Sequence, residues 1–225
     1  MMKEDSSRAQ AKILVVCAAN ICRSPAAELF MHSAWATSKA YERLSLDFDS
    51  AGAHAIAGMP RCEVSESLVG QTYATPSQEL PEDLSEYDLI LTMERSHRGP
   101  IVVGSPSVRS RVFTLVEAAQ LAAFIAGPGL VLDAATGVEL GDQSDYDFDS
   151  VPKLPDESGQ RWRWFTAELD AWRGQVPLNL QMDFLAVVDI PDPHDYQQDI
   201  HSESFSRINQ AVEVFITALT EVMSR

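Results

Sequence analysis

The chain has 225 residues, 45% of them hydrophobic, and carries 17 Lys and Arg against 33 Asp and Glu, a formal net charge of −16 at pH 7. This length and apolar content suffice for one substantial core, alone or with a large insertion. The acidic balance argues against binding to nucleic acid or to an anionic membrane, because like charges repel. An anionic substrate would therefore need a strong local site.

The first ten residues, the most apolar stretch and the cysteine content of the chain indicate a cytoplasmic location. Residues 1–10 are polar and mixed in charge, unlike a signal peptide, and the apolar stretch 121–132 is short and interrupted by Gly127-Pro128-Gly129. Three cysteines are present, two of them in one motif. This pattern indicates reduced thiols rather than a disulfide framework. We expect a cytoplasmic protein without a membrane span.

The first elements alternate between strands and helices. Residues 13–16, Ile-Leu-Val-Val, form an apolar run typical of a buried parallel strand. After a cysteine-rich turn, Pro25 favours a helix start, because its fixed φ suits the first helical position. Further strands are predicted at residues 46–51, 87–93 and 111–115, with helices at residues 63–69 and 95–103 between them. The alternation predicts an α/β fold, a parallel sheet with helices on both faces.

The last segment is the clearest helix of the sequence. Its apolar residues recur at three- and four-residue steps and so share one face. They are Phe205, Ile208, Val212, Phe215, Leu219 and Val222.

Residues 118–185 depart from this pattern. A helix predicted at residues 114–126 leads into a Gly/Asp-rich region at 127–159, and a second helix follows. Apolar residues on one face of that second helix are Trp162, Phe165, Leu169 and Trp172. We interpret 118–185 as a mostly helical insertion packed on a single domain. The predicted core of that domain is formed by residues 11–117 and 186–225.

The most informative stretch is residues 17–25, Cys-Ala-Ala-Asn-Ile-Cys-Arg-Ser-Pro, between the first strand and helix. Loop amides and the positive helix end converge there, which suits a tetrahedral dianion. The same field favours a thiolate, so Cys17 is a candidate nucleophile. Arg23 supplies a planar fork for two phosphate oxygens, and Ser24 can donate a hydrogen bond to the Cys17 sulfur. The strand–loop–helix context favours this interpretation over a packed structural cysteine.

Residues 16–25 resemble the signature loop of the low-molecular-weight protein tyrosine phosphatases. Three further blocks resemble the family in the same order: residues 49–52 (Asp-Ser-Ala-Gly), the predicted strand at 87–93, and residues 189–193 (Asp-Ile-Pro-Asp-Pro). The resemblance covers residues 12–117 and 186–223. It implies a four-stranded parallel sheet of the phosphotyrosine phosphatase I-like type and no cofactor. The insertion resembles an extension found in some bacterial members.

The resemblance implies a role for individual residues. Cys17 matches the nucleophile that forms a phosphocysteine, and Arg23 matches the phosphate clamp. Asp192 matches the general acid and base, a group that the chemistry requires because a phenolate leaves poorly unless protonated. Asn20, Ser24 and Ser50 are expected to support the loop. The residues expected around the phosphate are Ala18, Ala19, Asn20, Ile21, Cys22, Arg23 and Ser24.

The substrate implied is a phosphotyrosine-containing protein, with inorganic phosphate or sulfate as a bound anion. Ile56 and His194 fall at the expected pocket mouth, where family members often carry aromatic residues, and Ala19 replaces a usual glycine. An arsenate reductase on the same scaffold needs further cysteines, and none follows Cys62. Phosphoarginine phosphatases that resemble this loop carry threonine where Ile21 stands. A silent phosphate-binding module would lack the nucleophile, the arginine or the acid, and all three are present.

Other polar residues carry weaker signals. Cys22 could form a reversible protective disulfide with Cys17, or it could simply pack in the loop. Cys62 is interpreted as a bystander, and Arg95, His97 and Arg98 as a solvated helix face. Four aspartates have calcium-loop spacing without the required glycine, and the histidines lack metal spacing, so no metal site is predicted. These residues are Asp145, Asp147, Asp149 and Asp156, and His54, His97, His194 and His201.

Overall fold

The computed structural model describes residues 9–127, 154–175, 188–195 and 200–225. The aspartates with calcium-loop spacing at 145–149 and most of the predicted Gly/Asp-rich region lie outside the described residues.

Four parallel strands form one sheet in the order β2-β1-β3-β4. They are β1 (Ala9–Cys17), β2 (Leu44–Gly52), β3 (Leu89–Thr92) and β4 (Val112–Thr114). Val16 is in register with Ala51 on one side and with Thr92 on the other, so the carboxyl ends of the three strands meet. The predicted four-stranded parallel sheet is confirmed. Ligands bind such sheets beyond the carboxyl ends, where successive connections leave in opposite directions, and that point here is the end of β1.

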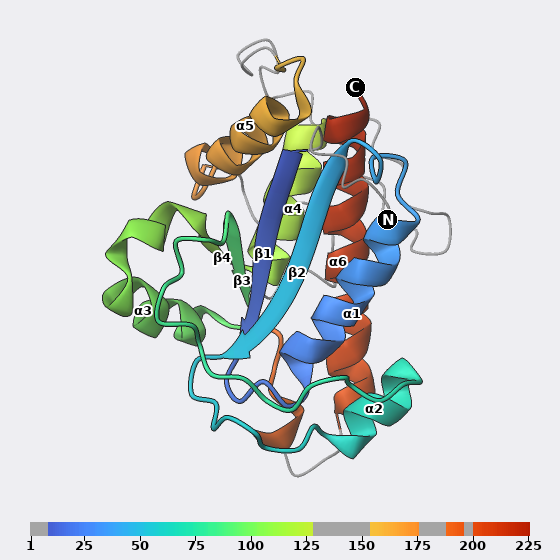
Figure 1. Cartoon of the computed structure of the whole chain (residues 1–225), viewed down its shortest axis with the longest axis vertical. Helices are drawn as coiled ribbons and strands as arrows, with labels where there is room; N and C mark the ends of the chain where they lie inside the picture. The colour runs from blue at the N-terminus through green and yellow to red at the C-terminus, as the bar shows by residue number, and fades with distance from the viewer. Residues whose placement is uncertain (1–8, 128–153, 176–187, 196–199) are drawn as a thin grey trace, which may run out of the picture.

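Helices cover both faces of the sheet, as predicted (Figure 1). They are α1 (Arg23–Ala36), α2 (Glu63–Val69), α3 (Arg95–Gly104), α4 (Leu115–Ala126), α5 (Ser158–Ala171) and α6 (His201–Ser224), with 3₁₀ turns η1 (Pro106–Arg111) and η4 (Pro193–Asp195). Helix α1 begins at Arg23, two residues before the start that Pro25 suggested. Pro25 still fits, because the first-turn N–H groups of a helix have no intrahelical partner.

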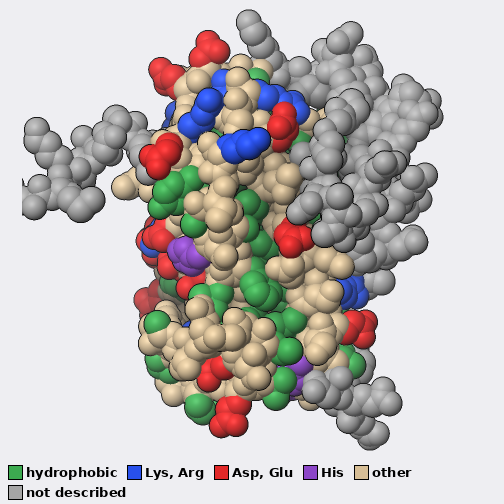
Figure 2. Space-filling view, turned by 90° about the vertical axis from the view of Figure 1, so that its right-hand side faces the viewer, with side chains coloured by type: hydrophobic (Ala, Val, Ile, Leu, Met, Phe, Trp, Pro, Cys, Tyr) green, Lys and Arg blue, Asp and Glu red, His purple; other side chains and the backbone are tan. Residues whose placement is uncertain are grey.

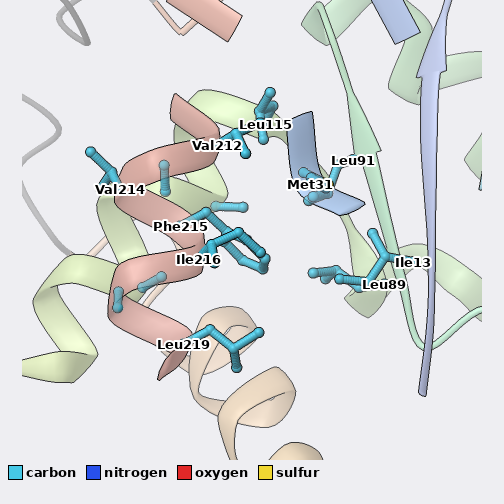
Figure 3. Packing of buried hydrophobic residues seen from close by; sticks show 14 of the residues in the cluster. Ile13, Met31, Leu89, Leu91, Leu115, Val212, Val214, Phe215, Ile216 and Leu219 are labelled. Atoms are coloured by element: carbon cyan, nitrogen blue, oxygen red, sulfur yellow. The ribbon is translucent and has the colours of Figure 1, made fainter. Parts of the chain in front are cut away.

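The alternation of strand side chains sorts the core into two layers. Ile13, Val15 and Leu91 pack with α1, α4, α5 and α6, whereas Leu14 and Val16 pack on the other face with residues of α3 and η1. Figure 3 shows the larger layer, in which the α6 stripe around Phe215 and Leu219 faces Ile13 and Leu89 of the strands. The apolar stripe predicted for the last helix therefore lies in this core layer, where α6 packs mainly against α4 and α1.

The predicted start of the insertion at Ala118 lies inside α4. This helix begins with a capping box, in which Thr114 and Glu117 satisfy each other's backbone N–H groups. Residues 115–126 are all buried, and their apolar members belong to the same core cluster as α6. The additional helix α5 packs on this cluster through Phe165, whose ring lies 6.1 Å from that of Phe215. Residues 118–126 thus belong to a core helix, and the boundary of the insertion stays a prediction.

The surface charge is spread unevenly. In Figure 2 the basic side chains on the visible face gather at its upper end, while the acidic ones are scattered. The carboxyl ends of β1 and β2 point to the lower end in the matching view of Figure 1.

Among the described residues, no helix combines the length and apolar character that a membrane crossing requires.

Candidate active site

The loop that follows β1 curls around the sulfur of Cys17. The backbone N–H of Asn20 donates to Cys17 Sγ over 3.2 Å, and the Ser24 hydroxyl lies 3.1 Å from the same sulfur. Cys17 is only 3% exposed. A sulfur that receives such hydrogen bonds at the start of α1 is in a site where negative charge is stabilised.

Asn20 is the centre of the network that holds this loop. Its φ of 52° is left-handed, a conformation that asparagine tolerates better than most residues. Its Nδ2 donates to Ser24 Oγ and to Ser50 Oγ, each over 2.9 Å. Its Oδ1 accepts from the Gln78 N–H and from Arg61 Nη1, each over 2.8 Å, and Arg61 also donates to the Asn20 carbonyl. The buried amide is therefore fully used, and the strained loop is fixed from three segments of the chain.

Gly52 lets β2 approach the same loop. A Cβ at this position would lie 2.7 Å from the Ala18 carbonyl oxygen, 2.7 Å from Ala55 Cβ and 2.9 Å from the Ala19 carbonyl carbon. The His54 N–H donates to that Ala18 carbonyl over 2.8 Å. Glycine is required here for close backbone contact. The half-buried residues Ala18, Ala19 and Ile21 complete the loop.

Arg23 is 1% exposed and lies between two carboxylates. Its guanidinium forms ion pairs with Glu94 and Asp192 and donates to the Ile190 carbonyl over 2.8 Å. Burial opposes the charged form, but the neighbouring Cys17, Glu94 and Asp192 together raise the pKa of Arg23 above its ordinary value. Arg23 is thus a permanent cation joined to Asp192, 169 positions away in sequence.

The segment that carries Asp192 is fastened to the end of β3. The Ile190 N–H donates to the Met93 carbonyl over 2.9 Å. Asp189 accepts from Arg95 through its backbone N–H at 2.7 Å and through Nε and Nη2 at 3.0 and 2.7 Å. Burial works against the Asp189 charge, yet these bonds lower the pKa of Asp189 below its usual range. This anchor brings Asp192 to the phosphate loop.

Glu94, Arg61 and Asp189 also belong to the site, although no sequence pattern predicts them there. The interpretation of Arg95, His97 and Arg98 as a solvated face is wrong for His97, which is 4% exposed, whereas Arg95 is exposed and also binds Asp189. The signal available was position: Glu94 and Arg95 directly follow a strand whose carboxyl end faces the site.

The other predicted site residues lie at the margins. Ile56 is 67% exposed, and His194 is exposed with its N–H donating to Asp192 Oδ1 over 3.0 Å. Cys22 is buried beside Phe205, in a cluster separate from the core layer that contains Cys17. Burial, with Cys62 nearby, raises the pKa of the Cys22 thiol. The predicted Cys17–Cys22 disulfide stays a prediction.

Residues 12–123 match the family model described as low molecular weight phosphotyrosine protein phosphatase. This part of the chain is similar in sequence to the members of that family. The low molecular weight protein-tyrosine-phosphatase Wzb of Salmonella typhi is 35% identical over 106 residues, which are 45% of this chain and 66% of Wzb. Wzb of Escherichia coli K12 is 31% identical over 105 residues, 44% of this chain and 66% of that protein. The chain thus spans just under two thirds of the length of these relatives.

The phosphatase family also accounts for the fold. YfkJ from Bacillus subtilis is similar with a TM-score of 0.52 and 17% identity, over 94% of this chain and 92% of that one. A protein tyrosine phosphatase from Entamoeba histolytica gives 0.51 and 16%, over 93% and 94%. The sequence match ends within α4, whereas the likeness of fold extends over most of the chain. The resemblance expected from residues 16–25 is confirmed at the level of family and fold.

Proposed function

We propose that this protein is a low-molecular-weight protein-tyrosine-phosphatase that works through a phosphocysteine on Cys17. The observation that carries the proposal is the junction of Cys17, Arg23 and Asp192 at the carboxyl end of a parallel sheet. The relatives named above supply the class of reaction. The residue roles follow from the geometry and from the requirements of phosphoryl transfer.

In the first step, the Cys17 thiolate attacks phosphorus and forms an S–P bond. The bond between phosphorus and the tyrosine oxygen breaks, and Asp192 gives its proton to that oxygen. In the second step, Asp192 takes a proton from water, whose oxygen attacks phosphorus. The S–P bond breaks, the Cys17 thiolate returns, and inorganic phosphate leaves.

Arg23 binds the phosphoryl oxygens through its fork in both steps. Its present partners, Glu94 and Asp192, show that the guanidinium can be bound from two sides at once. When a phosphate oxygen accepts the hydrogen bond from Arg23 Nη2, Asp192 loses that bond and is available to carry the proton. The loop residues Ala18, Ala19, Asn20, Ile21, Cys22 and Ser24 surround the phosphate, and free phosphate or sulfate is expected to bind at the same point.

The substrate is proposed to be a phosphotyrosine-containing protein. Ile21 supports tyrosine over phosphoarginine, because phosphoarginine phosphatases that resemble this loop carry threonine at that position. Because the surface is acidic, the anionic substrate has to be recognised by the local site, and neither nucleic acid nor a membrane is expected as a partner. We place the protein in the cytoplasm of a bacterium, since its three cysteines are free thiols and the Wzb relatives come from enteric bacteria.

Hydrolysis of p-nitrophenyl phosphate and of a phosphotyrosine peptide tests the assignment. Under reducing conditions, wild type should turn over both, Cys17→Ser neither, and Asp192→Asn the peptide about 10²–10⁴-fold more slowly. Asp170→Asn, an aspartate on α5 paired with Arg173, is the matched control and should act like wild type. An inactive wild type, or an active Cys17→Ser, would contradict the proposal.

The alternatives give different results in the same assay. A phosphoarginine phosphatase would hydrolyse a phosphoarginine peptide much faster than the phosphotyrosine peptide. An arsenate reductase would reduce arsenate with a thiol reductant and leave the phosphopeptides intact.

A further inference from the structure

Two cysteines and two histidines converge beside the phosphate loop, where the phosphate chemistry makes no use of their side chains. Cys22 lies in that loop, Cys62 precedes α2, His194 lies in η4, and His201 is the first residue of α6. One ligand atom from each of the four lies within 4.8 Å of all the others. Cys62 Sγ and His201 Nε2 are 3.5 Å apart, and the two imidazole rings are nearly perpendicular with centroids 4.9 Å apart.

We propose that Cys22, Cys62, His194 and His201 bind one zinc ion as a tetrahedral Cys₂His₂ site. Two sulfurs and two imidazole nitrogens form an established ligand set for structural zinc, and soft sulfur ligands select it over magnesium or calcium. With metal–ligand distances of about 2.0–2.3 Å, neighbouring ligand atoms of a tetrahedron lie about 3.5 Å apart. The Cys62–His201 pair already has this separation. The wider pairs need only a small closure around the ion.

One side of the four-residue site is fixed by backbone contacts, and the other side is exposed to solvent. The Cys62 N–H donates to the Ile21 carbonyl over 2.9 Å, which fixes the segment before α2 against the phosphate loop. Cys22 and His201 are buried, Cys62 is half-buried and His194 is exposed. The exposed histidine offers an entry path and completes the shell last.

The position of the buried thiol supports the same conclusion. Cys22 is 2% exposed and lies beside Cys62 and the two histidines. Metal binding replaces the thiol protons of cysteine ligands. Apolar packing with Phe205 accounts for the burial of Cys22, but it does not explain why two imidazoles meet two thiols.

The four ligands come from the segments that build the candidate active site. Cys22 precedes Arg23, and His194 lies two residues after Asp192. A closed four-ligand site has no position for substrate, so the zinc would be structural and would hold the Asp192 segment against the phosphate loop. This last consequence rests on the proposed phosphatase function, whereas zinc binding itself does not.

Metal content of the full-length protein tests the site directly. After reduction, loading with zinc and desalting, mass spectrometry of the metal should find one zinc per chain. With cobalt in place of zinc, thiolate-to-metal charge-transfer absorption and the visible bands of tetrahedral cobalt should appear. His194→Ala and Cys62→Ser should each raise the Kd for zinc at least about tenfold, in line with what disturbed ligand shells cost. The exposed His54→Ala is the matched control and should bind like wild type.

Cys17→Ser separates this proposal from the phosphatase proposal. It should abolish turnover and still bind one zinc with unchanged affinity. Loss of zinc in Cys17→Ser would instead place the metal on the catalytic thiol and overturn the proposal. So would a reduced wild type that retains no zinc and gives no cobalt bands, or His194→Ala and Cys62→Ser variants that bind zinc like wild type.

Discussion

Two regions of the molecule meet at β1, and they differ in the kind of side chain that they bury. Along its length, Ile13 and Val15 lie in an apolar layer that α4 and α6 close, and this layer depends on shape and burial alone. At its carboxyl end, Asn20, Arg23 and Ser50 are as deeply buried, but they are polar. Burying polar groups is costly unless each has a hydrogen-bond partner. The comparison teaches that stability resides mainly in the interior, while activity resides in a network that tolerates little change.

The largest effect is expected at the polar edge. Arg23→Ala should lower kcat/KM by about 10³-fold or more, because it removes the fork that stabilises transferring charge. Arg23→Lys should recover only part of the loss, since an ammonium cannot bind two oxygens as the planar fork does. Kinetics with p-nitrophenyl phosphate measure both, with the exposed Arg163→Ala on α5 as control. An Arg23→Ala enzyme within tenfold of wild type would contradict the assigned role.

The interior should show the reverse behaviour. Phe215 is fully buried and contacts Phe165, so Phe215→Ala should lower the free energy of unfolding by about 3–5 kcal/mol. Below the melting transition, kcat per folded molecule should stay near the wild-type value. Denaturant unfolding and active-site titration check the two statements. A stable Phe215→Ala protein with impaired kcat would break the division between the regions.

Gly52 lies where the two regions meet. Gly52→Ala should force the Ala18 carbonyl away and cost about 1–3 kcal/mol of stability, as overpacking does, together with a loss of phosphate affinity. Gly104→Ala is the matched control, because a Cβ at that position meets nothing within 4 Å. Unfolding and phosphate-inhibition measurements test the pair. Equal behaviour of the two variants would show that the loop does not need the close approach of β2.

The smallest effect concerns pH. Burial, and then the charge of Arg23, lowers the pKa of His97 below its ordinary value of 6.5. Between the two pKa values the unfolded chain binds more protons, so stability should fall as pH drops below 6.5 and be fully present above it. His97→Gln should flatten this part of the stability curve in denaturant titrations at several pH values. An unchanged slope in the variant would assign the pH dependence to other groups.

Local patterns predicted most of the fold. The run at residues 13–16 and the stripe around Phe215 each produced the expected element, because burial sets their apolar pattern, and the helix predicted at 63–69 is also present. The insertion boundary at Ala118 stays a prediction; it falls within α4, a core helix whose start is marked by the Thr114–Glu117 capping box.

The site was predictable only in part. Cys17 and Arg23 share one loop, so their spacing is visible in sequence. The contacts of Arg23 with Glu94 and of Asn20 with Arg61 arise where separate segments meet, and local spacing carries no trace of them. The same holds for Cys22, Cys62 and His201, which span 179 positions and meet only in the fold.

The central claim is that phosphate passes through Cys17. Asp192→Asn should let p-nitrophenolate leave, since this leaving group needs little protonation, and should slow the attack of water. Mixed with p-nitrophenyl phosphate, rapidly denatured and digested, this variant should yield phosphate on the peptide that contains Cys17, with a burst of p-nitrophenol equal to the enzyme present. Continued turnover without phosphate on Cys17, or with phosphate on another residue, would contradict the account.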